Sequence, residues 1–260
     1  MDLEIRNKRV LITGSSKGIG FEIAKTFAQE GACPILVSRD LDRLRIAAAE
    51  IQASTGVACE TIAADLSQSG TSDTLLAQVG VVDILVNNAG AIPGGDINQV
   101  DEVTWRDAWD LKVFGFINMT RSFLKPMAER GEGVILNIIG QAGSAPRSDY
   151  ICGSTGNAAL MAFTRAIGGT SVNSGVRIFG INPAPTRSDR MEGLLRRQAK
   201  IRFDDEERWQ ELTKQLAFGR LIEPPEIARL AVFCGSPLCS YLSGTVIDVD
   251  GGMLYAPPRY

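Results

Sequence analysis

Short runs of Val, Ile and Leu recur along the chain, and a segment with helical spacing of apolar residues follows nearly every one of them. Near-continuous apolar runs are typical of strands buried on both faces, and their alternation with helices is typical of a parallel sheet. The sequence therefore predicts an α/β fold with helices on both faces of the sheet. The expected strands cover residues 10–12, 34–38, 57–63, 82–86, 134–139, 176–181 and 245–249.

The same periodicity predicts where the helices lie and how the chain divides. No internal repeat, low-complexity tract or linker interrupts the alternation, so we expect one domain over residues 1–260. Residues 189–217 are charged, helical in pattern and least like the rest of the chain. The other main helices are expected at 41–54, 104–130, 153–172 and 224–234.

Composition excludes several classes of function. A net charge of −3 gives no reason to expect a nucleic acid or an anionic membrane as partner, and no apolar run reaches the length of a membrane span. The chain has no histidine, which excludes Ser-His-Asp and Cys-His catalysis and any imidazole metal site. The five cysteines are widely spaced and the N-terminus lacks the features of a signal peptide, so we expect reduced thiols in a cytoplasmic protein without a bound metal.

A glycine-rich turn joins the first expected strand to the first expected helix. Such a turn brings backbone N–H groups and a positive helix end to one point, which suits a phosphate. The glycine spacing is Gly-x3-Gly-x-Gly, and we interpret these glycines as letting a diphosphate approach without meeting a Cβ. The candidate cofactor-binding residues of the turn are Gly14, Ser15, Ser16, Lys17, Gly18, Ile19 and Gly20.

Polar residues follow the carboxyl ends of the expected strands, where ligands bind in parallel sheets. Arg39 follows the second strand, and an arginine there accommodates a 2′-phosphate where an acidic residue would bind a 2′-hydroxyl. Lys17 adds a second cation, so the sequence favours NADP(H) over NAD(H). NAD(H) stays the alternative cofactor, because the Asp40 carboxylate would suit a 2′-hydroxyl if Arg39 turned away.

Four motifs together resemble the short-chain dehydrogenase/reductase family over nearly the whole chain. They are Thr13-Gly-x3-Gly-x-Gly20, Asp65–Leu66, Asn87–Asn88–Ala89–Gly90 and Val249–Asp250–Gly251–Gly252. The resemblance implies a doubly wound Rossmann-type sheet of about seven parallel strands and NAD(P)-dependent oxidoreduction of a small-molecule substrate.

The resemblance also implies roles for individual residues. Asp65 and Leu66 would border the adenine, and Asn88, Ala89 and Gly90 the adenosine ribose. The segment Asn182–Pro183–Ala184–Pro185–Thr186 would flank the nicotinamide, with Pro183, Thr186 and Ser188 at the cofactor and Ala184 in place of a glycine. Residues 187–217 would form a substrate lid, and the helices at 104–130 and 153–172 would join subunits into a homotetramer or homodimer.

The catalytic Asn, Ser, Tyr and Lys of the family are all absent from their expected positions. A gap-free alignment places Lys112 at the Asn, Gly140 at the Ser, Gly153 at the Tyr and Asn157 at the Lys position. A second register would place Tyr150 at the Tyr position and Ser154 at the Lys position, and it also breaks the Tyr-Lys pair.

Three hypotheses follow. In the first, other residues take over the catalytic roles. Tyr150 precedes Asn157 by seven residues, which is similar to the Tyr-x6-Lys of enoyl-thioester reductases. Lys112 would then supply the cation that Asn157 lacks. Residues i and i+7 share a helix face, so both side chains would reach one pocket. In the second, water relays the proton in a slow carbonyl reductase. In the third, the protein binds its nucleotide and acts as a sensor or partner subunit.

The expected lid carries six cations between residues 187 and 202, followed by four acidic residues. These cations are Arg187, Arg190, Arg196, Arg197, Lys200 and Arg202. They would attract an anionic substrate such as a carboxylate or an acyl thioester of coenzyme A. The alternative is an amphipathic helix whose charges pair with one another in solvent.

Overall fold

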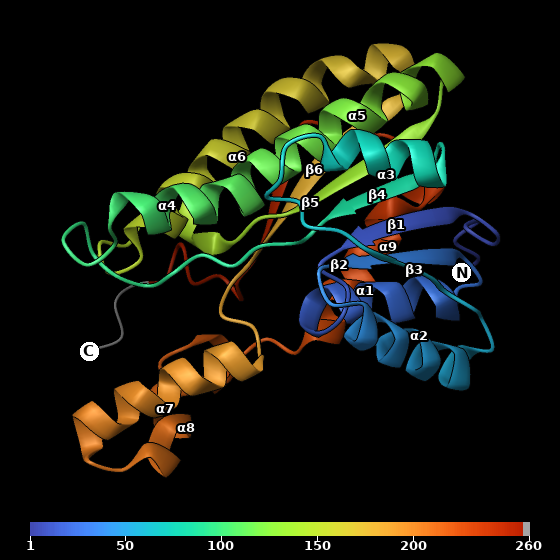
Figure 1. Cartoon of the computed structure of the whole chain (residues 1–260). Coiled ribbons are helices and arrows are strands. Elements are labelled where there is room, and N and C mark those ends of the chain that lie inside the picture. The colour runs from blue at the N-terminus through green and yellow to red at the C-terminus, as the bar shows by residue number, and fades with distance from the viewer. Residues whose placement is uncertain (257–260) are drawn as a thin grey trace.

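A computed structural model describes residues 1–256 and contains one sheet of seven parallel strands in the order β3-β2-β1-β4-β5-β6-β7. This arrangement confirms the predicted doubly wound, Rossmann-type α/β fold (Figure 1). The strands are β1 (Arg9–Thr13), β2 (Cys33–Ser38), β3 (Glu60–Ala63), β4 (Ile84–Asn87), β5 (Gly133–Ile138), β6 (Val176–Pro183) and β7 (Val246–Val249).

Helices cover both faces of the sheet (Figure 1). One face carries α1 (Gly18–Gln29), α2 (Leu41–Thr55) and α9 (Pro224–Gly235). The other face carries α3 (Thr71–Val79), α4 (Glu102–Trp109), α5 (Gly115–Arg130) and α6 (Ile151–Ser171). The helices α7 (Asp189–Phe203) and α8 (Trp209–Thr213) project from the body beyond the carboxyl end of β6 (Figure 1).

Alternate residues of each strand pack into two separate cores. In β1, Val10 and Ile12 join the core beneath α1 and α9, whereas Leu11 joins the core beneath α5. Phe27 and Phe123 fill these two cores and have no exposed surface. Truncating a buried Phe to Ala costs about 3–5 kcal/mol, so both layers fix the sheet firmly.

The strand order reverses between β1 and β4, which lie side by side although 70 residues of chain separate them. A parallel sheet opens a crevice at such a switch point, beyond the carboxyl ends of the strands. The glycine turn after β1 and the Asn88–Gly90 segment after β4 both reach this crevice.

Several elements differ from the sequence expectation, most of them by one to three residues at an end. The helix expected over 104–130 is interrupted by a π-helical segment, Asp110–Phe114, which carries Lys112. Helix α6 begins at Ile151 instead of 153, so Tyr150 is its N-cap residue. The strand expected from 57 begins at Glu60.

Within residues 1–256, no helix combines the length and the hydropathy needed to cross a membrane.

Candidate active site

The carboxyl ends of the central strands open onto a cleft of about 1760 Å³. The glycine turn and the segment after β4 line one part of it, and residues 138–150, α6 and α7 line another. Of the nineteen residues predicted for cofactor binding or catalysis, sixteen line this cleft. The sixteen are Gly14, Ser16, Lys17, Gly18, Ile19, Arg39, Leu66, Asn88, Ala89, Gly90, Lys112, Tyr150, Asn157, Pro183, Thr186 and Ser188.

Helix α1 begins at the glycine turn with free backbone donors. Its N-cap residue, Lys17, makes no side-chain capping bond, and no acidic residue lies in the first turn. Gly18 has φ +62°, and a Cβ there would point into open space. Uncapped N–H groups at the end of a helix dipole suit a phosphate.

At the other two positions of the turn, glycine is required for a different reason from the one inferred from the sequence. A Cβ at Gly14 would lie 2.8 Å from Ala89 Cα, and a Cβ at Gly20 would lie 2.5 Å from Gly14 O. These glycines therefore let the turn pack against β4 and against itself. Only Gly18 leaves space on the cleft side.

Three predicted cofactor residues lie outside the cleft lining and hold the backbone in place. The Ser15 hydroxyl donates to Ile12 O and accepts from Val37 N, both at 2.9 Å. Gly20 is buried inside α1. Asp65 Oδ1 accepts from Ser67 N and Oγ at 3.1 and 2.8 Å.

Asn88 ties the two central loops together. Its Nδ2 donates to Thr13 O and Gly14 O at 3.0 and 3.1 Å, and its backbone N donates to Thr13 Oγ1 at 2.9 Å. The side chain of Asn88 thus fixes the glycine turn against the end of β4.

The end of the cleft at β2 carries an unpaired cation. Arg39 is exposed to the cleft and makes no hydrogen bond or ion pair with any residue of the described chain, 1–256. The Asp40 carboxylate caps α2 by accepting from Arg43 N at 3.0 Å, and it pairs with the Arg43 guanidinium at 3.2 Å. Asp40 is therefore engaged by its own helix, whereas Arg39 is free to meet a phosphate.

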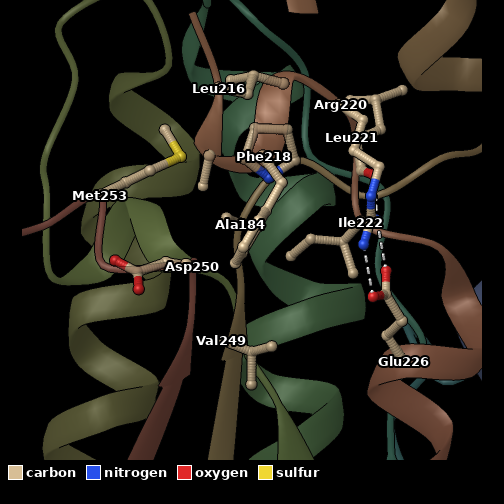
Figure 2. A pocket seen from close by; sticks show the side chains of 13 residues that line it. Ala184, Leu216, Phe218, Arg220, Leu221, Ile222, Glu226, Val249, Asp250 and Met253 are labelled. Atoms are coloured by element: carbon tan, nitrogen blue, oxygen red, sulfur yellow. Dashed lines mark hydrogen bonds and ion pairs between the residues drawn. The ribbon is translucent and has the colours of Figure 1, made fainter.

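The loop after β6 forms another wall of the cleft. Thr186 Oγ1 donates to Ala184 O at 2.9 Å, and Ser188 caps α7 by accepting from Met191 N at 3.2 Å. A cavity of about 90 Å³ lies behind this loop, and Ala184 and Phe218 are among the residues at its wall (Figure 2). Its volume admits only a few atoms, so it cannot hold a dinucleotide.

Lys112 reaches the cleft from the π-helical segment. Its Nζ donates to Ile139 O at 2.7 Å and lies 5.7 Å from the centre of the Phe116 ring. A Cβ at Gly90 would lie 2.8 Å from Lys112 Cδ, so the glycine makes room for the side chain. Burial, together with the nearby charge of Arg190, lowers the pKa of Lys112 to about 8.

Asn157 fills the space in front of Gly140. A Cβ at Gly140 would lie 2.8 Å from Asn157 Nδ2, and Gly140 has φ +141°, a conformation that favours glycine. Asn157 is buried, and its Oδ1 has no hydrogen-bond partner within residues 1–256. An orphaned buried acceptor is rare, and this one borders the cleft.

The Tyr150 ring fills the space in front of Gly153, as the Asn157 amide fills the space in front of Gly140. A Cβ at Gly153 would overlap the Tyr150 ring, so the ring stands where a side chain at 153 would emerge. Tyr150 precedes α6, so the expectation that it shares a helix face with Asn157 is wrong, although both line the cleft. Ser154 is bonded to Arg147 N at 2.9 Å and does not line the cleft, which disfavours the second register.

Arg190 joins α7 to this site. Its guanidinium donates to Ile92 O and lies beside the Tyr150 hydroxyl. Burial raises the pKa of Tyr150, while the charge and hydrogen bond of Arg190 act in the opposite direction. The sequence interpretation grouped Arg190 with the other cations of residues 187–202. Its position two residues after Ser188, a predicted cofactor residue, is a signal that could have placed it in the site.

Three other cations of residues 187–202 form ion pairs. Arg187 pairs with Glu192 and Glu223 at 2.9 and 2.8 Å. Lys200 pairs with Asp204 at 2.7 Å and Arg196 with Glu207 at 2.5 Å. The pairs of Arg196 and Lys200 agree with a self-paired, solvated helix, whereas Arg187 precedes α7 and is held in part by Glu223.

Comparison with known proteins defines the class of this fold and site. Residues 8–199 match the family model described as short chain dehydrogenase. The chain therefore belongs to the short-chain dehydrogenase family, and the predicted oxidoreductase class is confirmed.

Individual relatives cover nearly the whole chain. A 3-oxoacyl-(acyl-carrier-protein) reductase of Chlamydia muridarum is 30% identical over 95% of this chain and 97% of its own. Galactitol 2-dehydrogenase (L-tagatose-forming) of Cereibacter sphaeroides is 32% identical over 93% and 92%. L-sorbose reductase of Gluconobacter frateurii, solved with NADPH and L-sorbose, is 30% identical, with a TM-score of 0.90 over 99% of this chain and 100% of that chain.

Proposed function

We propose that this protein uses NADP(H) to reduce a carbonyl group of a small or acyl-linked substrate, with Tyr150 as proton donor and Lys112 as the supporting cation. One observation carries the proposal: the Tyr150 ring and the Asn157 amide occupy the spaces in front of Gly153 and Gly140. A site that had only lost its side chains would leave those spaces empty. The filled spaces favour relocated chemistry over loss of chemistry.

The choice of NADP(H) rests on the residues at the two phosphate positions. Arg39 lines the cleft with an unpaired positive charge within residues 1–256, Lys17 lines it while paired with Asp189 at 3.4 Å, and Asp40 is engaged in capping α2. Uncapped donors of α1 suit the diphosphate, and the orphaned Asn157 Oδ1 suits a cofactor hydroxyl. The related L-sorbose reductase was solved with NADPH, which agrees with this choice.

The proposed reaction converts C=O to CH–OH. NADPH held in the cleft would supply the hydride for the carbonyl carbon and be oxidised to NADP⁺. Tyr150 donates its hydroxyl proton to the carbonyl oxygen. Since arginine has only donors, the Tyr150 oxygen accepts from Arg190 and keeps its own proton for the substrate.

Lys112 and Arg190 supply the electrostatic part of the mechanism. Both carry positive charge beside the developing oxyanion, and such preorganised charge stabilises a transition state. Arg190 also favours the phenolate that Tyr150 becomes after proton transfer. The related enzymes named above act on carbonyl compounds or the corresponding alcohols, which favours a carbonyl over an enoyl substrate.

Replacing Tyr150 by Phe tests the proposal, because it removes the hydroxyl and leaves the ring over Gly153. We expect kcat for carbonyl reduction by NADPH to fall about 10²–10⁴-fold, with NADPH affinity unchanged. Tyr241→Phe is the matched control, since Tyr241 lies fully on the surface. Full activity of Tyr150→Phe would favour proton relay by water, and absence of turnover in the parent protein on carbonyl and enoyl panels would favour a sensor or partner subunit.

We also propose that the protein is a homodimer or homotetramer joined through α4, α5 and α6. The proposal rests on the resemblance to the short-chain dehydrogenase/reductase family, and Val103 of α4 and Phe114 of the π-helical segment are exposed apolar residues of the same helical layer.

A further inference from the structure

Two cations that line the cleft and influence each other have no anionic partner within residues 1–256. Lys112 and Arg190 form no ion pair with any carboxylate in the described part of the chain, and Arg190 is the charge that perturbs Lys112. Both side chains line the same cleft as Tyr150. The place where substrate would meet Tyr150 is therefore electropositive.

Four carboxylates line the cleft: Glu22 lies on α1 at the glycine turn, and the other three are paired or bonded elsewhere. Asp149 pairs with Arg147 at 2.6 Å, and Asp189 pairs with Lys17 at 3.4 Å. Asp40 is held at the start of α2. The site thus keeps a net positive charge where it faces the substrate.

Arg190 is fixed by neutral acceptors. One N–H donates to the Ile92 carbonyl and the guanidinium lies beside the Tyr150 hydroxyl, so Arg190 is oriented by neutral groups while its charge stays uncompensated. A guanidinium has five N–H donors in a planar fork that matches a carboxylate. The remaining donors of Arg190 are available to a ligand.

We infer that the substrate is an oxo-carboxylate whose carboxylate binds Arg190 while its carbonyl oxygen meets Tyr150. This inference rests on the proposed carbonyl reduction. Because Arg190 and Tyr150 line the same cleft and Arg190 lies beside the Tyr150 hydroxyl, a short distance between the carboxylate and the carbonyl fits this site. That distance selects 2-oxo and 3-oxo acids over compounds with a remote acidic group.

The test compares acids with their neutral esters in the parent protein and in Arg190→Gln. The substrates are 2-oxohexanoate and 3-oxohexanoate and their methyl esters, reduced with NADPH. We expect the parent to prefer at least one acid over its ester, and Arg190→Gln to lower kcat/KM for that acid about 10–100-fold more than for the ester. Arg190→Lys should recover part of the preference, because it restores the charge without the planar fork.

Arg202→Gln is the matched control, because Arg202 lies on the same helix, stacks on Phe203 at 5.5 Å and does not line the cleft. It should leave the preference for the acid unchanged. A binding measurement without turnover adds an independent readout: hexanoate should bind to the NADPH-loaded parent protein, and Arg190→Gln should abolish that binding.

The outcomes separate this inference from the proposed function. Equal use of acids and esters, or equal losses for both in Arg190→Gln, would overturn the inference and leave carbonyl reduction in place. Arg190-dependent binding of hexanoate without reduction of any oxo compound would support the anion site and overturn carbonyl reduction.

Discussion

The nucleotide end of the cleft and its chemical end are built in different ways. At the nucleotide end, the glycine turn, Arg39 and Asn88 follow directly after strands, and neighbouring strands bring them together. At the chemical end, Lys112, Tyr150 and Arg190 come from a π-helical segment, a helix cap and a separate helix. Strand ends position the first set, whereas side-chain packing positions the second.

This difference explains why one end matches the family motifs and the other does not. Phosphate binding by a helix N-terminus uses backbone groups, so it survives changes in side chains provided that the turn keeps its shape. Proton transfer uses one side chain in one place. Here the space in front of Gly153 is filled from Tyr150, three residues earlier, without any change in the strands.

The largest expected effect concerns the chemical end. Lys112→Met removes the ammonium and keeps most of the apolar stem. We expect kcat/KM for carbonyl reduction to fall about 10²–10⁴-fold, because preorganised charge at the oxyanion is lost, while the Kd of NADPH changes little. Steady-state kinetics and fluorescence titration measure the two quantities.

Lys125→Met is the control, since Lys125 lies on α5 and is exposed. If Lys112→Met and Lys125→Met are equally active, Lys112 has only a structural role and the comparison between the two ends fails.

An intermediate effect is expected at the nucleotide end. Arg39→Ala removes the cation that faces the adenosine ribose, so the Kd of NADPH should rise about 10–100-fold while that of NADH stays nearly constant. Calorimetric titration with both cofactors measures this selectivity. Arg45→Ala, on an exposed part of α2, should alter neither affinity. Equal losses for NADPH and NADH would contradict the 2′-phosphate assignment.

The smallest expected effect is a pH dependence confined to the chemical end. The pKa of Lys112 is lowered to about 8, so its ammonium loses a proton as the pH rises through that value. Because the charged form is the active one, kcat/KM should fall above pH 8 by up to about tenfold per pH unit. Arg190→Gln removes a neighbouring positive charge and should move the break to higher pH. A profile that is flat from pH 7 to 10 in the parent protein would remove Lys112 from the mechanism.

Much of the site could be predicted from the sequence because its residues follow local patterns. Arg39 and Gly18 sit at strand and helix ends that apolar periodicity locates within a few residues. Why glycine is required at positions 14 and 20 could not be predicted, because the requirement comes from the close approach of Ala89 to Gly14 and of Gly14 O to Gly20. Arg190 was missed as a site residue because its partners, Ile92 and Tyr150, lie 98 and 40 residues away.

The sequence by itself determined the parallel sheet and the position of the glycine turn, and it predicted that the usual catalytic side chains are absent. Each of these depends on residue type and short-range order. Tertiary structure alone decided that Tyr150 and Asn157 fill the spaces at Gly153 and Gly140, and that Lys112 and Arg190 line the same cleft and influence each other. Those contacts depend on where distant elements pack, and the local pattern of apolar residues carries no information about the direction of a single polar side chain.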